Sequence, residues 1–168
     1  MTNASYMAIK GARQGFFKGE HRRPAGSHFA GAMWIPVVDY SMSFNSPGNP
    51  RLEKAGGKGQ HEPFSVTIGW GRWSAQIFSA VMNNEVLDRV ILDFSSSNNS
   101  RCESYELIEL TEVVATHVTI HSKGKTGQVQ VVNFEYRRVD LETGHDSHKN
   151  KNTGSQREWE PPVFAYRI

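Results

Sequence analysis

The feature that most constrains the fold is an alternation of apolar and polar side chains that recurs along most of the sequence. In residues 64–70, Phe64, Val66 and Ile68 occupy every second position, and residues 128–141 alternate in the same way. A period of two is typical of a strand with one face on a core and the other in solvent. Many such segments, separated by short polar turns, predict a mainly β protein built from antiparallel strands.

One segment has helical periodicity instead. Trp73, Ile77 and Ala80 recur at the spacings that place side chains on one face of a helix. Ser74 is the expected N-cap, because its hydroxyl can accept an N–H of the first turn. The asparagines that follow tolerate the left-handed conformation of a helix end. The sequence therefore predicts one short helix, over about Ser74–Asn83, in a small β-barrel or β-sandwich.

The remaining strands are separated by turn-forming residues. Pro36 cannot donate to a sheet ladder, so its strand is expected at an edge or with a bulge at that point. After Leu141 the sequence is polar and aperiodic, which predicts a domain over 1–141 and a polar tail over 142–168, ordered at most through Trp159 or the terminal residues. The expected strands cover residues 6–11, 33–44, 64–70, 87–94, 105–110, 112–121 and 128–141.

A long aperiodic segment, Ser46–Pro63, separates two of these strands and ends in the run GGKGQHEP. Extended loops of this length in a compact domain are often functional. A phosphate-binding loop would need a glycine in place of Leu52, a hydroxyl in place of Gly59 and a helix directly after it. The segment has none of these, so we expect a flexible loop and no nucleotide site.

Composition and charge argue against several classes of protein. The 168 residues include 19 basic and 17 acidic side chains, a balance that does not favour a dedicated nucleic-acid binder. Cys102 is the single cysteine, so neither an intrachain disulfide nor a thiolate metal cluster is expected. No apolar run approaches the ~20 residues of a membrane span, and the first residues lack the pattern of a signal peptide. The expectation is cytoplasmic synthesis, with any export carried out by a dedicated machine.

Candidate catalytic and metal-binding patterns are weak. His117 and His121 have the four-residue spacing of a helical metal site, but on a strand that spacing separates them by ~13 Å. They are instead expected on one polar face of a sheet, together with Thr119. No Gly-x-Ser-x-Gly elbow for a nucleophile occurs. The sequence therefore predicts no enzyme activity, no cofactor and no metal site.

Two tryptophans flank the start of the helix. We expect Trp73 in the core, as part of the apolar helix face. Trp70 is a candidate for a contact between subunits, because tryptophan is enriched among interface anchors.

The order of these elements and five sequence motifs resemble the Hcp (hemolysin-coregulated protein) family, the tube proteins of bacterial type VI secretion systems. The resemblance covers roughly residues 6–141. Its motifs are YMAIKGARQGFFKGE, GGKGQHEPFSVTI, WSAQIFSAVMNNEVLDRVILDF, YELIELTEVVATHVTIH and VNFEYRRVDL.

The resemblance implies a β-barrel with one helix at its side, copies of which form a homo-hexameric ring. Rings stack into a tube inside a contractile sheath, and contraction expels the tube with a spike protein at its tip, so the protein is secreted without a cleavable signal peptide. The lumen can also hold effector proteins. In the family, the loop that corresponds to Ser46–Pro63 reaches toward neighbouring subunits. The expected assembly residues are Gly56, Gly57, Lys58, Gly59, His61 and Trp70.

Two alternatives stay open from the sequence. The tail-tube protein of a contractile phage-like particle has a similar architecture. A monomeric ligand-binding β-barrel could use Gly56–His61 as a lid. Six-fold rings would distinguish a tube protein from a monomer, and neighbouring genes for sheath and spike proteins would distinguish secretion from a phage.

Overall fold

The structure is a computed structural model, in which residues 5–21, 32–45, 60–94, 96–98, 101–145 and 164–167 are described. In chain order its elements are β1 (Ser5–Gly11), β2 (Gly15–Phe16), β3 (Ile35–Ser41), β4 (Phe44–Asn45), β5 (Gln60–His61), β6 (Phe64–Gly69), α1 (Ser74–Met82), β7 (Val86–Asp93), β8 (Ser96–Asn98), β9 (Arg101–Ser122), a 3-10 helix (Gly124–Thr126), β10 (Gln128–His145) and β11 (Phe164–Arg167).

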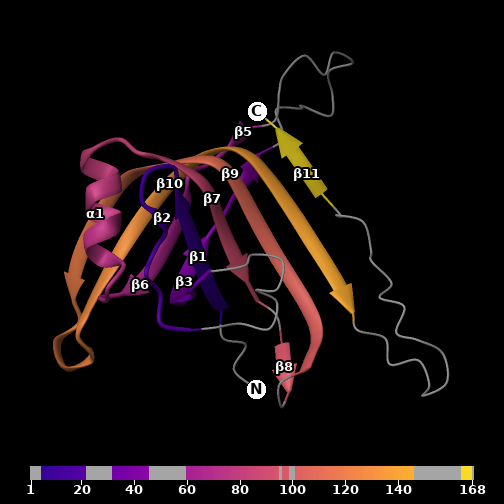
Figure 1. The fold of residues 1–168 in the computed structure, drawn as a ribbon, viewed down its shortest axis with the longest axis horizontal. Coiled ribbons are helices and arrows are strands. Elements are labelled where there is room, and N and C mark those ends of the chain that lie inside the picture. Colours follow the sequence, from indigo (N-terminus) through magenta and orange to yellow (C-terminus); the bar gives the residue numbers. More distant parts are fainter. Residues whose placement is uncertain are drawn as a thin grey trace.

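Six antiparallel strands close into a barrel (Figure 1). The hydrogen-bonded order around it is β1, β3, β6, β10, β9, β7 and back to β1. This arrangement confirms the predicted mainly β fold with one short helix. Because the sheet closes on itself, every barrel strand is paired on both sides over part of its length, which limits the edges on which another chain could add a strand.

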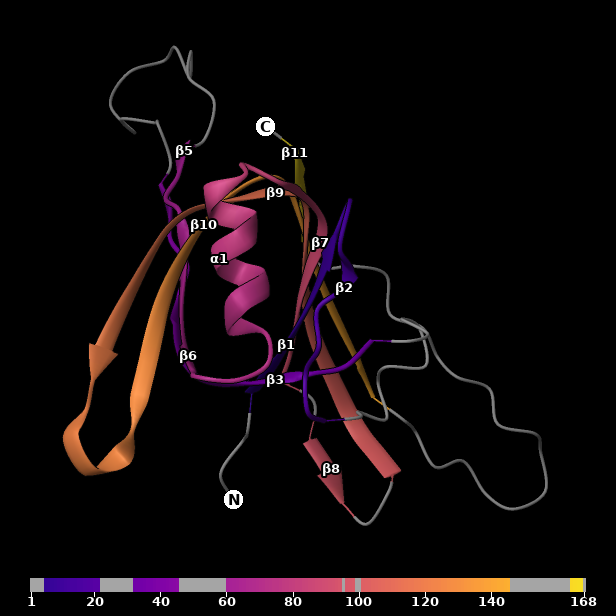
Figure 2. The same cartoon turned by 60° about the vertical axis from the view of Figure 1, so that its left-hand side comes forward.

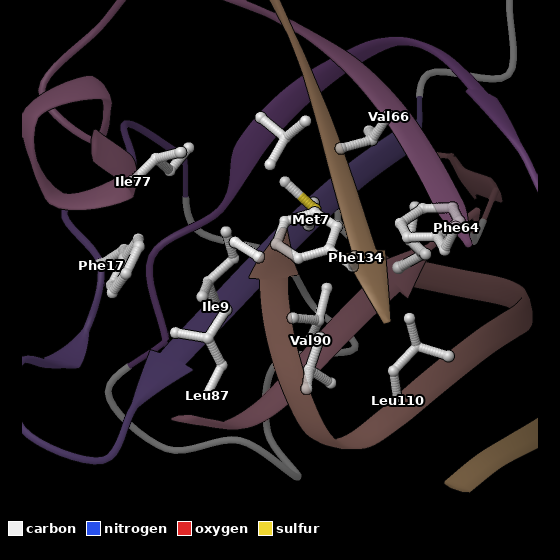
Figure 3. Close-up of a cluster of buried hydrophobic side chains, with 14 of the residues drawn as sticks. Met7, Ile9, Phe17, Phe64, Val66, Ile77, Leu87, Val90, Leu110 and Phe134 are labelled. Atoms are coloured by element: carbon white, nitrogen blue, oxygen red, sulfur yellow. The ribbon is translucent and has the colours of Figure 1, made fainter. Parts of the chain in front are cut away.

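Apolar side chains fill the interior of the barrel. Phe64, Val66 and Ile68, the predicted inward face of β6, are all fully buried. Phe134 on the neighbouring strand β10 stacks on Phe64, with ring centroids 6.0 Å apart, and Met7 of β1 points into the same cluster (Figure 3). Burial of each such side chain contributes ~1.5–3 kcal/mol to stability. The barrel is therefore a packed core.

A second apolar cluster lies on the opposite face of β1 and β7. Trp34 is fully buried there, and its backbone exchanges hydrogen bonds with His21. Strands that are covered on both faces read as continuous apolar runs, so the alternation used for prediction did not reveal this cluster. It comprises Ala8, Trp34, Ile91 and Leu107.

The helix α1 connects β6 to β7 and lies between these two strands in Figure 2. Its limits agree with the prediction, and Asn84 has a φ of 49°, which confirms the left-handed helix end. The predicted cap is wrong, because the N-cap is Trp73 and makes no side-chain capping bond. The Ser74 hydroxyl instead accepts the N–H of Gly71 at 3.0 Å, so it is engaged upstream of the helix.

The strand that contains Pro36 is not at an edge, contrary to one of the two expectations. β3 pairs with β1 through residues 35–37 and with β6 through residues 37–41. Its register to β6 shifts between Val37 and Asp39, directly after the proline. This bulge, which was the other expectation, lies just after Pro36; the proline itself pairs with Tyr6 of β1 and precedes the first pair of β3 with β6, so its missing N–H falls outside the β6 ladder.

Two predicted strands, 105–110 and 112–121, are one continuous strand, β9, of 22 residues. The alternation breaks at Glu112 because this residue has a positive φ of 53°, an irregularity within the strand rather than a turn. β10 also runs beyond the predicted end at Leu141 to His145, paired with the start of β9. The terminal strand β11 pairs with β10 at residues 138–141.

Truncation of the Phe134 ring tests the packing of the barrel interior. Phe134→Ala should lower the free energy of unfolding by ~3–5 kcal/mol, because it leaves a cavity where the ring contacts Phe64. Glu135→Ala, at an exposed position on the same strand, should change it by less than ~0.5 kcal/mol. Urea unfolding of both variants measures the difference. Equal effects at the two positions would contradict a packed barrel interior.

Candidate assembly surfaces

The base of the predicted loop is a short β4–β5 hairpin. Phe44 pairs with His61 and Asn45 with Gln60. The His61 ring packs against the Tyr136 ring, with centroids 4.6 Å apart. Tyr136 belongs to the barrel core, and burial raises the pKa of its hydroxyl to about 12. His61 therefore joins the loop to the barrel through a contact with a neutral aromatic side chain.

The other predicted loop residues lie outside the part of the chain that the structure describes. These are Gly56, Gly57, Lys58 and Gly59.

Trp70 lies in the turn between β6 and α1 and is 52% exposed, whereas Trp73 is buried, as expected. The Trp70 ring lies 5.9 Å from that of Phe78, and its backbone N–H donates to Gln128. Trp70 is thus an exposed aromatic side chain on an anchored backbone. Since β6 separates it from His61 by roughly 20 Å, the structure does not bring these two candidates together.

A buried polar cluster fixes the turn that carries Trp70. Gln130 is fully buried and donates to the carbonyl of Gly69 at 3.3 Å and to the Ser74 hydroxyl at 3.0 Å. The indole N–H of Trp73 donates to the same carbonyl at 3.0 Å. Sequence reasoning missed Gln130, although it is in phase with Val132 and therefore occupies an inward position of β10. A polar residue on the apolar face of a strand was the available signal.

A second polar contact joins the β1–β2 turn to the end of α1. The Glu85 carboxylate is only 4% exposed and accepts the backbone N–H groups of Arg13 at 2.8 Å and Gln14 at 3.1 Å. The Gln14 side-chain amide donates to its other oxygen at 2.8 Å. Gly11 provides the space, because a Cβ there would lie 2.6 Å from a Glu85 oxygen.

The environment of Glu85 favours its charged form. Burial acts to raise the pKa of the carboxyl, but the hydrogen bonds from the Gln14 side chain and from the two backbone N–H groups, with the charge of Arg13, outweigh it. The pKa is therefore lowered. No sequence pattern pointed to Glu85, because its partners lie about seventy positions away.

Several large apolar side chains are exposed on the described surface. They come from β3, β4, the β6–α1 turn, α1, β7 and β9, and they offer contact area to other chains. They are Val38, Tyr40, Phe44, Trp70, Met82, Val86 and Ile120.

Among the described residues, no group of three or more His, Cys, Asp or Glu side chains is placed to hold a metal ion. His117 and His121 are both exposed on β9, and the Thr119 hydroxyl lies 2.7 Å from Nε2 of His117, as expected for one polar face of a strand. Over the same described ranges, no helix has the length and apolar character to cross a membrane.

Comparisons with known proteins agree on one family. Residues 6–142 match the family model described as "Type VI secretion system effector, Hcp". A solved structure described as an Hcp protein is similar with a TM-score of 0.66 at 19% identity, covering 86% of this chain and 98% of that one. No curated protein matches the sequence.

Two further solved structures have the same fold. Hcp1 from E. coli EAEC 042 gives a TM-score of 0.65 at 17% identity, covering 83% of this chain and 90% of its own. A type VI secretion system effector from Yersinia pestis gives 0.62 at 14% identity, covering 96% and 99%. At 14–19% identity, these similarities show that the proteins share a fold.

Substitution of Glu85 tests the contact between the β1–β2 turn and α1. Glu85→Gln should lower the free energy of unfolding at neutral pH by ~1.5–3 kcal/mol, because charge-assisted hydrogen bonds are lost. Since the folded pKa lies below the unfolded value of 4.5, the carboxylate stabilises the fold above pH 4.5, and this contribution is lost as the pH falls through the folded pKa. The gap between wild type and variant should therefore shrink below pH 4.5.

Urea unfolding over a series of pH values measures this gap. Glu135→Gln, at an exposed position of β10, serves as the matched control and should leave the stability unchanged at every pH. A gap for Glu85→Gln that stays constant down to the most acidic pH would show that the carboxylate charge is not its source.

Proposed function

This chain belongs to the Hcp family of type VI secretion proteins and is a structural tube subunit, not an enzyme; from this premise we propose that six copies form a ring and that the rings stack into the secreted inner tube. The observation that carries the proposal is the family match over residues 6–142, which covers α1 and all six barrel strands except the first residue of β1 and the last three of β10. A ring needs a heterologous interface that closes, and a stack needs a second, head-to-tail interface.

The proposed partners are other copies of this chain and the components of the secretion machine. A sheath would surround the tube, a spike protein would occupy its tip, and effector proteins would travel in its lumen. The chain would be synthesised in the cytoplasm and leave the cell with the tube, without a cleavable signal peptide. The proposed division is a barrel domain over 1–141 and a polar tail over 142–168, of which residues 142–145 continue β10 and residues 164–167 pair with β10 as β11.

The loop Ser46–Pro63 is the proposed contact to neighbouring subunits. Its base is attached to the barrel through the β4–β5 hairpin and the contact between His61 and Tyr136. The glycines Gly56, Gly57 and Gly59 would give the loop reach, with Lys58 as a polar contact. Ordering such a loop costs ~1–2 kcal/mol per residue in backbone entropy. This cost would keep stacking weak until another component nucleates the tube.

Two other functions have less support. A monomeric ligand-binding barrel needs an internal cavity, whereas the interior here is filled by side chains such as Met7, Phe64 and Phe134. A tail-tube subunit of a phage-like particle would have similar architecture. Genes for sheath and spike proteins of a secretion system beside this one would favour the secretion tube.

Deletion of Gly56–Gly59 tests both levels of the proposed assembly. In negative-stain images and native mass spectra, the wild-type protein should form six-fold rings and stacks of rings. The deletion should keep the rings and reduce the stacks, because the reach of the loop is lost. A wild-type chain that stays monomeric at high concentration would contradict the proposal. Normal stacking by the deletion variant would show that the loop does not make the stacking contact.

Truncation of Trp70 tests the second candidate contact. Trp70→Ala should leave the unfolding midpoint close to that of wild type, because the ring is half exposed, yet weaken assembly by roughly tenfold or more, as expected for an interface anchor. Met82→Ala removes an apolar side chain that is 82% exposed on α1 and should assemble normally. Sedimentation of the assembled fraction compares them, and equal assembly of Trp70→Ala and wild type would contradict the role of Trp70.

A further inference from the structure

The buried amide of Gln130 lies on the inward, otherwise apolar face of β10, two positions from Val132. Its Nε2 donates to the Gly69 carbonyl at 3.3 Å and to the Ser74 hydroxyl at 3.0 Å. Gly69 is the last residue of β6 and Ser74 is the first residue of α1, so one side chain of β10 holds both ends of the turn between them. In Figure 2 this turn passes beneath the lower end of α1.

The orientation of the Gln130 amide follows from its neighbours. The Gly69 carbonyl can only accept a hydrogen bond, so the nitrogen of the amide and not its oxygen must face it. The oxygen, Oε1, is buried, and no donor in the described part of the chain reaches it. A buried amide oxygen that has lost its hydrogen bond to water and gained no other destabilises the fold.

Neither of the two acceptors depends on Gln130 for a donor. The Gly69 carbonyl also accepts the indole N–H of Trp73 at 3.0 Å, and the Ser74 hydroxyl also accepts the N–H of Gly71 at 3.0 Å. An apolar side chain of similar length at position 130 would leave both acceptors bonded and would remove the unpaired oxygen. Stability therefore does not explain a glutamine at this position.

An apolar side chain could not replace the direction of the two hydrogen bonds. Apolar contact depends on buried area and not on orientation, whereas a hydrogen bond weakens steeply when donor and acceptor turn out of line. The two bonds of Gln130 thus fix the distance and the angle of the turn relative to β10. The backbone adds a third attachment, because the N–H of Trp70 donates to the carbonyl of Gln128 at 3.2 Å.

The turn is closely packed on its inner side and carries an exposed ring on its outer side. A Cβ on Gly71 would lie 2.4 Å from a ring carbon of Trp73, so the backbone of the turn lies directly against this buried ring. The Trp70 ring is 52% exposed and lies 5.9 Å from the ring of Phe78. A half-exposed aromatic side chain is thus carried on a backbone segment that is held both from the core and from β10.

We propose that Gln130 is a positioning residue for the contact that Trp70 makes between copies of the chain. Its two hydrogen bonds hold the β6–α1 turn, and the Trp70 side chain on it, in the orientation in which a neighbouring copy binds. An anchor that is already held in its bound orientation loses less conformational entropy on association. This inference rests on the proposed assembly and on Trp70 as an anchor in it, and it assigns the fixed geometry of that anchor to one residue.

Replacement of Gln130 by methionine separates positioning from stability. Methionine has a similar length and volume and no polar group that could be left unpaired. Gln130→Met should unfold at the same urea concentration as wild type or at a higher one, yet raise the protein concentration needed for assembly by roughly three- to tenfold. Gln128→Met makes the same change at an exposed position of the same strand and should match wild type in both measurements. A loss of stability in Gln130→Met would show that Gln130 supports the fold itself, and would overturn the inference.

A double-mutant cycle with Trp70→Ala gives a readout that a merely structural role would not move. Because Gln130 acts through Trp70, Gln130→Met should weaken assembly of the wild-type chain and have no further effect on Trp70→Ala. Sedimentation of the assembled fraction over a range of protein concentrations compares the four proteins. Equal fold-changes in both backgrounds would show that Gln130 acts by another route, which would contradict the proposal.

Amide hydrogen exchange of the dilute, unassembled protein tests the turn directly. The N–H groups of Trp70 and Gly71 should exchange roughly tenfold faster in Gln130→Met, because the turn opens more often without its attachment to β10. The N–H of Phe134, in the paired part of β10, should keep its wild-type rate. Unchanged rates at the turn would show that it keeps its geometry without Gln130, and the positioning role would be wrong.

Failure of the inference can be distinguished from failure of the proposed function. If Trp70→Ala weakens assembly but Gln130→Met does not, only the positioning role of Gln130 is wrong. If Trp70→Ala assembles as wild type does, the Trp70 contact is wrong and this inference fails with it, while the rings and stacks remain. If the wild-type chain forms no assembly at any concentration, the proposed function fails as well.

Discussion

The pairing of β10 with both β9 and β6 is the contact on which the rest of the structure depends. If either of these pairings were lost, the six strands would form an open sheet with two unpaired edges, and the inward side chains of β6 and β10 would face solvent. With it, the inward faces of all six strands meet at one centre, where Phe64 and Phe134 stack. Closure therefore produces the core and at the same time limits the strand edges at which copies of the chain could associate without control.

A closed and filled barrel leaves recognition to the parts that project from it. Three of the described projections are the β4–β5 base of the loop, the β6–α1 turn and the β9–β10 hairpin. Each is held by specific contacts: His61 on Tyr136, Gln130 and Ser74 beneath the turn, and a hydrogen-bonded 3-10 helix at the hairpin tip. Anchored projections lose less entropy on association than free ones, which suits surfaces that must dock repeatedly in one geometry.

The sequence predicted the elements whose residues follow one period. The inward face of β6 and the limits of α1 are of this kind, since each depends on neighbours within a few positions. Prediction from the sequence failed where a residue's conformation or burial depends on distant partners or on geometry that follows no period. Ser74 is engaged by Gly71 and Gln130, Glu112 adopts a positive φ inside a strand, and Trp34 covers a second face of β1 that an alternation cannot reveal. Of the candidate assembly residues, His61 and Trp70 could be placed, and the structure shows them at opposite ends of β6.

The long ladder between β9 and β10 has a mechanical consequence. Its hydrogen bonds lie across the strand direction, so a force that slides β9 along β10 loads many of them in parallel, and they must yield together. A pull across the ladder would instead open it one bond at a time, starting at an end. The ribbon formed by β9 and β10 is therefore strong against sliding of one strand along the other and weak against peeling from one end.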